Sequence, residues 1–227
     1  MRNIDNYRNS KGEIWLNVAS STQVLEDFVN IDNSIFLRFL TIFTYLPIFI
    51  PHKYRHAAKG YSAAQKKALL IRHDCRKPLF FYNHTVDHIL CSHFLEHVFP
   101  IEMESILHEF YRVLKPRATM HVIVPDLQAQ AEQYLIKNRN GEPLAADWFM
   151  NETMLGREST SFKYRFLELL GAFGLQHKWM YDHSSIKKKL QDIGFEILAK
   201  NQTPSKLYRL NDGSVHVVAC KQEVDPL

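Results

Sequence analysis

Several familiar sequence signatures are missing from this chain. It contains no GxSxG, P-loop or HExxH pattern, so a serine hydrolase, a nucleotide triphosphatase and a zinc protease have no support. The three cysteines, Cys75, Cys91 and Cys220, are odd in number and have no CxxC spacing. We therefore expect reduced thiols and no zinc site. Residues 1–13 are polar and include no apolar signal region, so we expect a cytoplasmic protein.

The chain also lacks a strong charge bias and an internal repeat. Its net charge of +4 is mild, and Lys and Arg are spread along the sequence apart from two local clusters, which is unlike the footprint of a nucleic-acid-binding protein. Apolar, aromatic and charged residues occur in proportions that are ordinary for a globular protein. A length of 227 residues suits one α/β core, so we expect a single domain, residues 1–227.

No apolar run is long enough for a membrane span. The most apolar segment, residues 35–51, contains Arg38 and is interrupted by Pro47 and Pro51, whereas a spanning helix needs about 20 apolar residues. We interpret residues 34–68 as an insertion whose apolar part is a lid over a ligand cleft, an interfacial segment that contacts a membrane, or a subunit contact. The basic stretch 52–67 suits an interfacial helix, a solvated helix face or a site for a negatively charged substrate.

Residues 86–126 predict a strand, a helix and a second strand. Two apolar runs, 86–91 and 120–124, flank a segment whose apolar residues follow helical spacing, namely Ile106, Leu107, Phe110, Val113 and Leu114. Residues 115–117 break this pattern, since they contain a proline, which cannot continue a helix. Two buried strands joined by a helix are normally parallel, with a right-handed crossover.

Polar residues follow each strand that we expect in this half of the chain. Further strands are predicted at 13–19, 28–31 and 68–73. In an open parallel sheet, ligands bind outside the carboxyl ends of the strands. The candidate site residues are therefore Ser20, Ser21, Thr22, Asp32, Asp74, Ser92, His93, Glu96, His97 and Asp126. An acidic residue at a strand end, such as Asp32, either accepts the hydroxyls of a ribose or serves as a turn or cap residue.

The C-terminal half predicts two further helices and a closing strand pair. A helix is expected at 127–138, with Ala129, Ala131 and Leu135 on its apolar side, and the aromatic region 142–182 is interpreted as the wall of a pocket. A second helix should begin with Ser184 or Ser185 as its N-cap and end at Gly194, with its lysine run 187–189 on a solvated face. Strands at 195–201 and 214–221 should pair antiparallel.

Several motifs together resemble one known family. They are IRHDCRKPLFFYNHTVDHILCSHFLEHV and LHEFYRVLKPRATMHVIVPD within residues 68–126, then QHKWMYDHSSIKKKLQDIGFEI and the final HVVACK. In order and spacing they are similar to class I S-adenosylmethionine-dependent methyltransferases, above all to small methyltransferases encoded with bacterial surface-polysaccharide and glycan pathways. The resemblance implies an α/β, Rossmann-like, doubly wound and mostly parallel seven-stranded sheet whose last strand is antiparallel.

The resemblance also implies a reaction. S-adenosylmethionine would donate a methyl group to a hydroxyl or amine of a sugar, or of a nucleotide-linked or lipid-linked glycan, and S-adenosylhomocysteine would be the product. The region 142–182 would cover the acceptor. Nucleic acid is not expected as a partner, and membrane contact, if present, would be peripheral and involve residues 35–51.

The cofactor residues carry over one by one from the resemblance. The loop after the first strand approaches the methionine end of the cofactor, Asp32 binds the ribose, Asp74 and Cys75 contact the adenine, and Ser92 and His93 lie beside the methyl group. The residues of that loop are Asn17, Val18, Ala19, Ser20 and Ser21. The family usually has glycine, serine and glycine in place of the last three, and Asn17 replaces a frequent carboxylate. The alternative is therefore a binding or scaffold protein that keeps the fold without catalysis.

Methyl transfer to a hydroxyl also needs a group that removes a proton. Histidine suits this task because its pKa lies near working pH, so His93 and His177 are the candidates, with Asp126 orienting either one or acting as the base. Each has a structural alternative: His93 as a helix-start residue, Asp126 as an N-cap and His177 in a polar network. Glu96 and His97 are interpreted as supports of the turn. No metal site is predicted, since the remaining histidines have no metal-ligand spacing with a carboxylate or cysteine.

Overall fold

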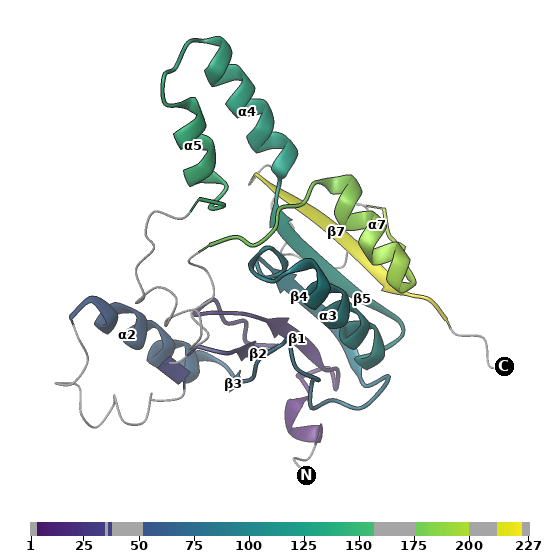
Figure 1. The fold of residues 1–227 in the computed structure, drawn as a ribbon. Helices are drawn as coiled ribbons and strands as arrows, with labels where there is room; N and C mark the ends of the chain where they lie inside the picture. Colours follow the sequence, from purple (N-terminus) through teal and green to yellow (C-terminus); the bar gives the residue numbers. More distant parts are fainter. Residues whose placement is uncertain (1–3, 35, 38–51, 157–175, 200–212, 224–227) are drawn as a thin grey trace.

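A computed structural model describes residues 4–34, 36–37, 52–156, 176–199 and 213–223 (Figure 1). Within these ranges seven strands form one sheet in the order β3-β2-β1-β4-β5-β7-β6. The strands are β1 (Trp15–Val18), β2 (Val29–Asp32), β3 (Leu70–Arg72), β4 (Val86–Ser92), β5 (Leu114–Pro125), β6 (Phe195–Ile197) and β7 (Ser214–Lys221). All run parallel except β7, which is antiparallel to both β5 and β6. The predicted fold class is confirmed.

The central strands are buried on both faces. In β1, Leu16 and Val18 have no exposed surface, and in β4 four successive residues, 88–91, are buried. Helices cover both sides of a parallel sheet, which is why these strands appear in the sequence as continuous apolar runs rather than as alternating patterns. Strands β1, β2 and β4 lie close to their predicted positions.

Strand β5 is longer than the sequence suggested. The prediction placed it at 120–124, because Pro116 was interpreted as a break, whereas the strand begins at Leu114. Its pairing with β4 shifts register between Val86↔Leu114 and His88↔Thr119. Residues 115–118 therefore bulge out of the ladder, and a proline is tolerated there because its missing N–H is not needed.

Helices α3 (Pro100–Val113) and α7 (His183–Ile193) lie side by side on one face of the sheet (Figure 1). The apolar stripe of α3 is buried as predicted. The N-cap of α7 is Asp182 and not Ser184 or Ser185: the Asp182 carboxylate accepts from the Ser185 N–H at 2.7 Å, and Ser185 Oγ accepts from the Asp182 N–H at 3.0 Å. In this capping box the side chain of each residue accepts a hydrogen bond from the backbone N–H of the other. Gly194 ends the helix at φ 107°, as predicted.

Helices α4 (Leu127–Arg139) and α5 (Ala145–Glu152) pack against each other and project away from the sheet (Figure 1). The prediction of a helix at this position is confirmed. Its apolar side does not enter the core, however, because α4 has no buried residue and Leu135 is 45% exposed. Residues 157–175, in the middle of the expected pocket wall, lie outside the described residues.

The described part of the expected insertion is mainly α2 (His52–Lys67), beside β2 and β3 (Figure 1). Tyr61 and Ala64 of α2 pack on Val24 and Leu70 in a small apolar cluster. Most of the apolar segment 35–51 lies outside the described residues, and with it the predictions of a lid, a membrane contact or a subunit contact. Among the helices that the structure describes, none is long and apolar enough to cross a membrane.

Candidate functional site

Most of the predicted site residues meet at one edge of the sheet, where β1, β2, β3 and β4 end. Backbone hydrogen bonds join the segments that follow these strands: the Ser20 N–H donates to Ile31 O at 3.0 Å and the His73 N–H donates to Asp32 O at 3.0 Å. The His93 N–H donates to Ile123 O of β5 at 2.9 Å. The residues that follow β1, β3 and β4 are thus each bonded to a neighbouring strand, at the edge where an open parallel sheet binds its ligands.

The loop after β1 keeps a backbone conformation that favours glycine. Ala19 has φ 52° and Ser21 has φ 49°, both in the left-handed region. Each such residue costs about 1–2 kcal/mol when it carries a Cβ. The family resemblance leads us to expect glycine at both positions, and glycine adopts this conformation without that cost.

Asn17 and Val18 are the last residues of β1 and are buried, so they hold the start of this loop in place. The Asn17 amide, 4% exposed, donates to Gln23 O at 3.0 Å and to Asn30 Oδ1 at 2.9 Å, and Val18 lies in the core. Only Ala19, Ser20 and Ser21 therefore reach the edge of the sheet. The Ser20 hydroxyl is buried there and has no hydrogen-bond partner among the described residues. An unpaired buried hydroxyl is costly, so it is a candidate contact for a bound polar group.

Asp32 ends β2, and its carboxylate is partly occupied by groups of the protein. Oδ1 accepts from the Ser34 N–H at 2.8 Å and from the Tyr61 hydroxyl at 3.1 Å, and Oδ2 accepts from the Ser21 N–H at 2.9 Å. Burial raises the pKa of Asp32 above its usual value, although the bonds from Ser34, Ser21 and Tyr61 oppose the shift. Because each carboxylate oxygen offers about two acceptor positions, one position remains, on Oδ2.

Asp74 and Cys75 follow β3 in different environments. The Asp74 carboxylate forms a forked pair with the Arg76 guanidinium, at 3.0 Å and 2.8 Å. Burial would raise the pKa of Asp74, but the hydrogen bonds and charge of Arg76 lower it overall. Cys75 is buried, and burial raises the pKa of its thiol to about 12, against a hydrogen bond with the Ala19 backbone. Its side chain therefore supports the first loop from the core.

The end of β4 presents a histidine held by a buried carboxylate. His93 follows Ser92, has φ 50° and keeps half of its side chain exposed. Its Nδ1 lies 3.2 Å from Oε1 of Glu96, a residue with no exposed surface. Backbone strain often marks functional sites, and here it occurs at the ends of both β1 and β4. A carboxylate on one ring nitrogen orients the imidazole and stabilises its protonated form.

The two remaining candidates come from other segments: Asp126 follows β5, and His177 precedes α7. The Asp126 carboxylate accepts from the Gln128 N–H at 2.9 Å, so the capping role that the sequence left open is observed. His177 is 7% exposed, and its ring lies 4.9 Å from that of His97. Burial lowers the pKa of His177, while Glu96 acts in the opposite direction. His177 is thus close to the Glu96 and His97 turn, whereas Asp126 is engaged by α4.

Sequence reasoning missed one grouping. One ligand atom from each of Glu96, His97 and His177 lies within 4.8 Å of the others. The first two are adjacent in the chain and the third follows much later, so no local spacing could show the cluster. The available signals were the EH pair and the HKWMYD stretch, both of which belong to the motifs that carry the family resemblance.

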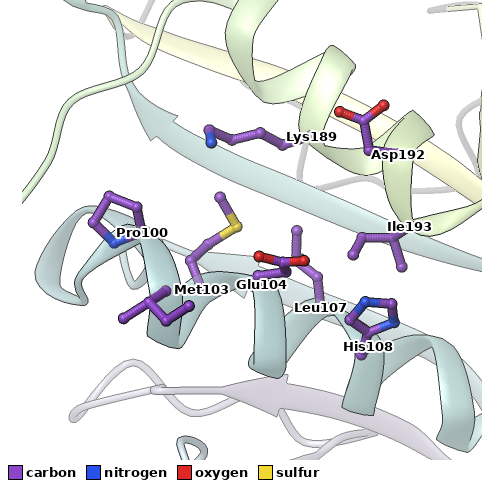
Figure 2. A pocket seen from close by; sticks show the side chains of 9 residues that line it. Pro100, Met103, Glu104, Leu107, His108, Lys189, Asp192 and Ile193 are labelled. Carbon is purple, nitrogen blue, oxygen red and sulfur yellow. The ribbon is translucent and has the colours of Figure 1, made fainter.

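Two cavities lie away from this edge. A groove of about 470 Å³ separates α3 from α7, and Figure 2 shows Met103 and Leu107 of α3 facing Lys189 and Ile193 of α7 across it. A second cavity, of about 640 Å³, lies near the opposite ends of β1, β4 and β5 and includes Trp15, His88 and Thr119. Neither contains a predicted site residue.

Comparison with known proteins agrees with this geometry. Residues 48–122 match the model of a family described as a methyltransferase domain. An S-adenosylmethionine-dependent methyltransferase of Methanosarcina mazei superposes with a TM-score of 0.51 at 17% identity, over 96% of both chains. The fold is that of the S-adenosylmethionine-dependent methyltransferases.

Other solved structures show the same fold. A protein of Pyrococcus horikoshii OT3 has a TM-score of 0.53 at 16% identity, over 94% of this chain and 84% of its own. The magnesium protoporphyrin IX methyltransferase of Synechocystis PCC 6803, solved with S-adenosylhomocysteine, has a TM-score of 0.50 at 12% identity, over 96% of this chain and 76% of its own. No curated protein matches. The domain match and the fold both indicate a methyltransferase.

Proposed function

We propose that this protein transfers the methyl group of S-adenosylmethionine to a hydroxyl or amine of a sugar, free or linked to a nucleotide or lipid. The observation that supports it most is the His93–Glu96 pair at the end of β4, beside the strained loop after β1. The sugar acceptor rests on the resemblance of residues 68–126 to methyltransferases of glycan pathways. We further propose a cytoplasmic protein.

The chain's residues fit this cofactor at several points. Asp32 retains an acceptor position for one ribose hydroxyl, Ser20 offers an unpaired hydroxyl, and the left-handed Ala19 and Ser21 keep the loop backbone in the shape that permits close approach. When bound, the sulfonium supplies an activated methyl group for in-line displacement. In this proposal His93 would accept the proton of the attacking hydroxyl, and the Glu96 carboxylate, 3.2 Å from His93 Nδ1, would stabilise the imidazolium that results.

A binding or scaffold protein is the second candidate, and one observation favours it. The side chains of Ala19 and Ser21 occupy positions where glycine would leave room for the ligand. Such a protein would bind the cofactor or a sugar without turnover.

Transfer of a labelled methyl group to a panel of sugars, nucleotide sugars and lipid-linked glycans tests the proposal. We expect labelled product with at least one acceptor, and a loss of roughly 100-fold or more in rate for His93→Gln, which keeps a polar side chain but cannot act as a base. His108→Gln, on the exposed side of α3, should retain full activity. Cofactor binding without any labelled product would favour the scaffold.

Peripheral membrane contact through residues 35–51 is part of the same proposal and is tested separately. Flotation with anionic liposomes should move the wild type into the lipid fraction if the segment is interfacial. Full retention in the aqueous fraction would leave the lid or subunit contact as its role.

A further inference from the structure

The turn after β4 and the segment before α7 together place three metal-ligating side chains in one small space. Glu96 and His97 belong to a 3-10 turn, Leu95–His97, and His177 comes from the far C-terminal part of the chain. One ligand atom from each lies within 4.8 Å of the others. The segments are joined by the backbone, since the Lys178 N–H donates to Glu96 O at 2.6 Å, and His97 Nδ1 lies 3.2 Å from Gln176 O.

Two of the three side chains present buried polar atoms without partners. Within the part of the chain that the structure describes, Oε2 of Glu96, a residue with no exposed surface, has no hydrogen-bond partner, and neither has Nδ1 of His177, which is 7% exposed. Leaving a carboxylate oxygen and an imidazole nitrogen unpaired inside a protein costs about 1–3 kcal/mol each, more for the charged group. A cation between Glu96 and His177 would satisfy both unpaired atoms at once and could also bind His97. A hydrogen bond between Glu96 and His177 would not involve His97.

We propose that Glu96, His97 and His177 bind one divalent transition-metal ion, with Zn²⁺ as the probe of choice. Two imidazoles and a carboxylate are the ligand set of a transition metal, because Mg²⁺ and Ca²⁺ prefer all-oxygen sites. Zn²⁺ is held by nitrogen and oxygen ligands at about 2.0–2.2 Å, so ligand atoms that lie up to 4.8 Å apart would approach one another on binding.

Glu96 would then have two roles through its two oxygens. Oε1 faces Nδ1 of His93 at 3.2 Å and Oε2 remains for the metal. Three protein ligands leave a coordination position that water or an alcohol oxygen can take, as in catalytic rather than structural zinc sites. If the proposed function holds, the oxygen of the acceptor would be held at this position, next to the base that removes its proton.

The test is metal binding by the full-length, tag-free protein without cofactor or acceptor. After treatment with a chelator and dialysis, Zn²⁺ is titrated by calorimetry, and Co²⁺ is added in parallel to follow the visible absorption of a bound ion. We expect one equivalent per chain. Glu96→Gln and His177→Gln, which nearly preserve volume, should each weaken binding at least about tenfold. His108→Ala removes an exposed histidine of α3 and should change nothing.

Three results would overturn the proposal: no uptake by folded wild type, uptake that Glu96→Gln and His177→Gln leave unchanged, or equal loss in His108→Ala. If a glutamine variant fails to fold, as circular dichroism would show, His97→Asn takes its place, since His97 is only partly buried. Because no cofactor is present, failure to bind metal leaves methyl transfer untouched, and failure of methyl transfer leaves metal binding untouched.

Discussion

At the scale of single residues, three of the six described non-glycine residues with positive φ lie where we propose that the cofactor binds. Ala19 and Ser21 follow β1 and His93 follows β4, all with left-handed φ near 50°. Neither alanine nor serine is needed for this conformation, which glycine adopts at no steric cost. Glycine at position 19 or 21 would allow the same loop shape without this strain.

Replacing these residues by glycine tests this account. Ala19→Gly and Ser21→Gly each relieve about 1–2 kcal/mol of strain and lose about 0.5–1 kcal/mol to the greater freedom of the unfolded chain. We expect unfolding free energies that stay level or rise by up to about 1.5 kcal/mol, measured by urea denaturation.

Ala63→Gly, at an exposed position of α2, is the matched control and should lose about 1 kcal/mol because glycine is a poor helix former. A similar loss at positions 19 and 63 would contradict the left-handed conformation at Ala19.

At the scale of elements, α2 belongs to the inserted segment and contacts the edge of the sheet at which we propose that the cofactor binds. The Tyr61 hydroxyl donates to Asp32 Oδ1 at 3.1 Å and lies 3.4 Å from Ser21 Oγ. Burial raises the pKa of Tyr61 to about 12, with the Asp32 charge acting in the same direction, so this phenol remains a donor at neutral pH. It occupies an acceptor position that the second ribose hydroxyl would use.

Tyr61→Phe should therefore strengthen cofactor binding while weakening the fold. Freeing the position on Asp32 is expected to raise the affinity for S-adenosylhomocysteine by up to about tenfold, and loss of the hydrogen bond should cost about 1 kcal/mol of stability. Calorimetry and urea denaturation measure the two effects. Weaker binding by the variant would mean that Tyr61 contacts the cofactor directly.

The last strand also secures the end of α3. Lys221 is 1% exposed, and its ammonium donates to the carbonyls of Tyr111 at 2.5 Å and Leu114 at 2.9 Å. These carbonyls lie at the helix end, where partners within the helix are missing.

Lys221→Met should lower the unfolding free energy by about 1–3 kcal/mol, since it leaves these buried carbonyls unpaired. The exposed Lys188 pairs with Asp192 on α7, and Lys188→Met should cost less than about 0.5 kcal/mol. Equal effects of the two substitutions would refute the capping role.

At the scale of the whole molecule, the sheet buries histidines in their neutral form. Burial lowers the pKa of His88 and of His121 from 6.5 to about 4, and the neighbouring His216 contributes to the shift of His121. Between pH 4 and pH 6.5 these two histidines bind more protons in the unfolded chain than in the folded one. Their contribution to stability is complete above pH 6.5 and is lost as the pH falls toward 4.

We therefore expect the unfolding free energy to fall between pH 6.5 and 4, by up to about 1.4 kcal/mol per pH unit for each of the two groups. Urea denaturation across this range gives the slope. His88→Gln should reduce it by about half, and the exposed His108→Gln should not. A pH-independent stability would contradict burial of neutral imidazoles.

The sequence predicted the sheet well because burial dictates its pattern. The run in β4 and the helical spacing of Ile106, Leu107 and Phe110 leave few alternatives, and the order of motifs indicated the topology. It predicted contacts less well, because these depend on distant segments. Nothing local to Asp32 shows that Tyr61 reaches it, and nothing near Glu96 shows that His177 approaches. The prediction that Pro116 lies outside the strand was wrong for a similar reason, because β5 tolerates this proline only through a shift in its register against β4.

The most direct test of the central claim is calorimetric titration of the folded protein with S-adenosylhomocysteine. The edge formed by β1, β2 and β4 predicts one binding site per chain. Asp32→Ala should weaken binding at least about tenfold, because it removes the acceptor for the ribose, while Asp192→Ala on the exposed face of α7 should leave it unchanged. Absence of binding, or binding that Asp32→Ala does not affect, would contradict a cofactor site at these strand ends.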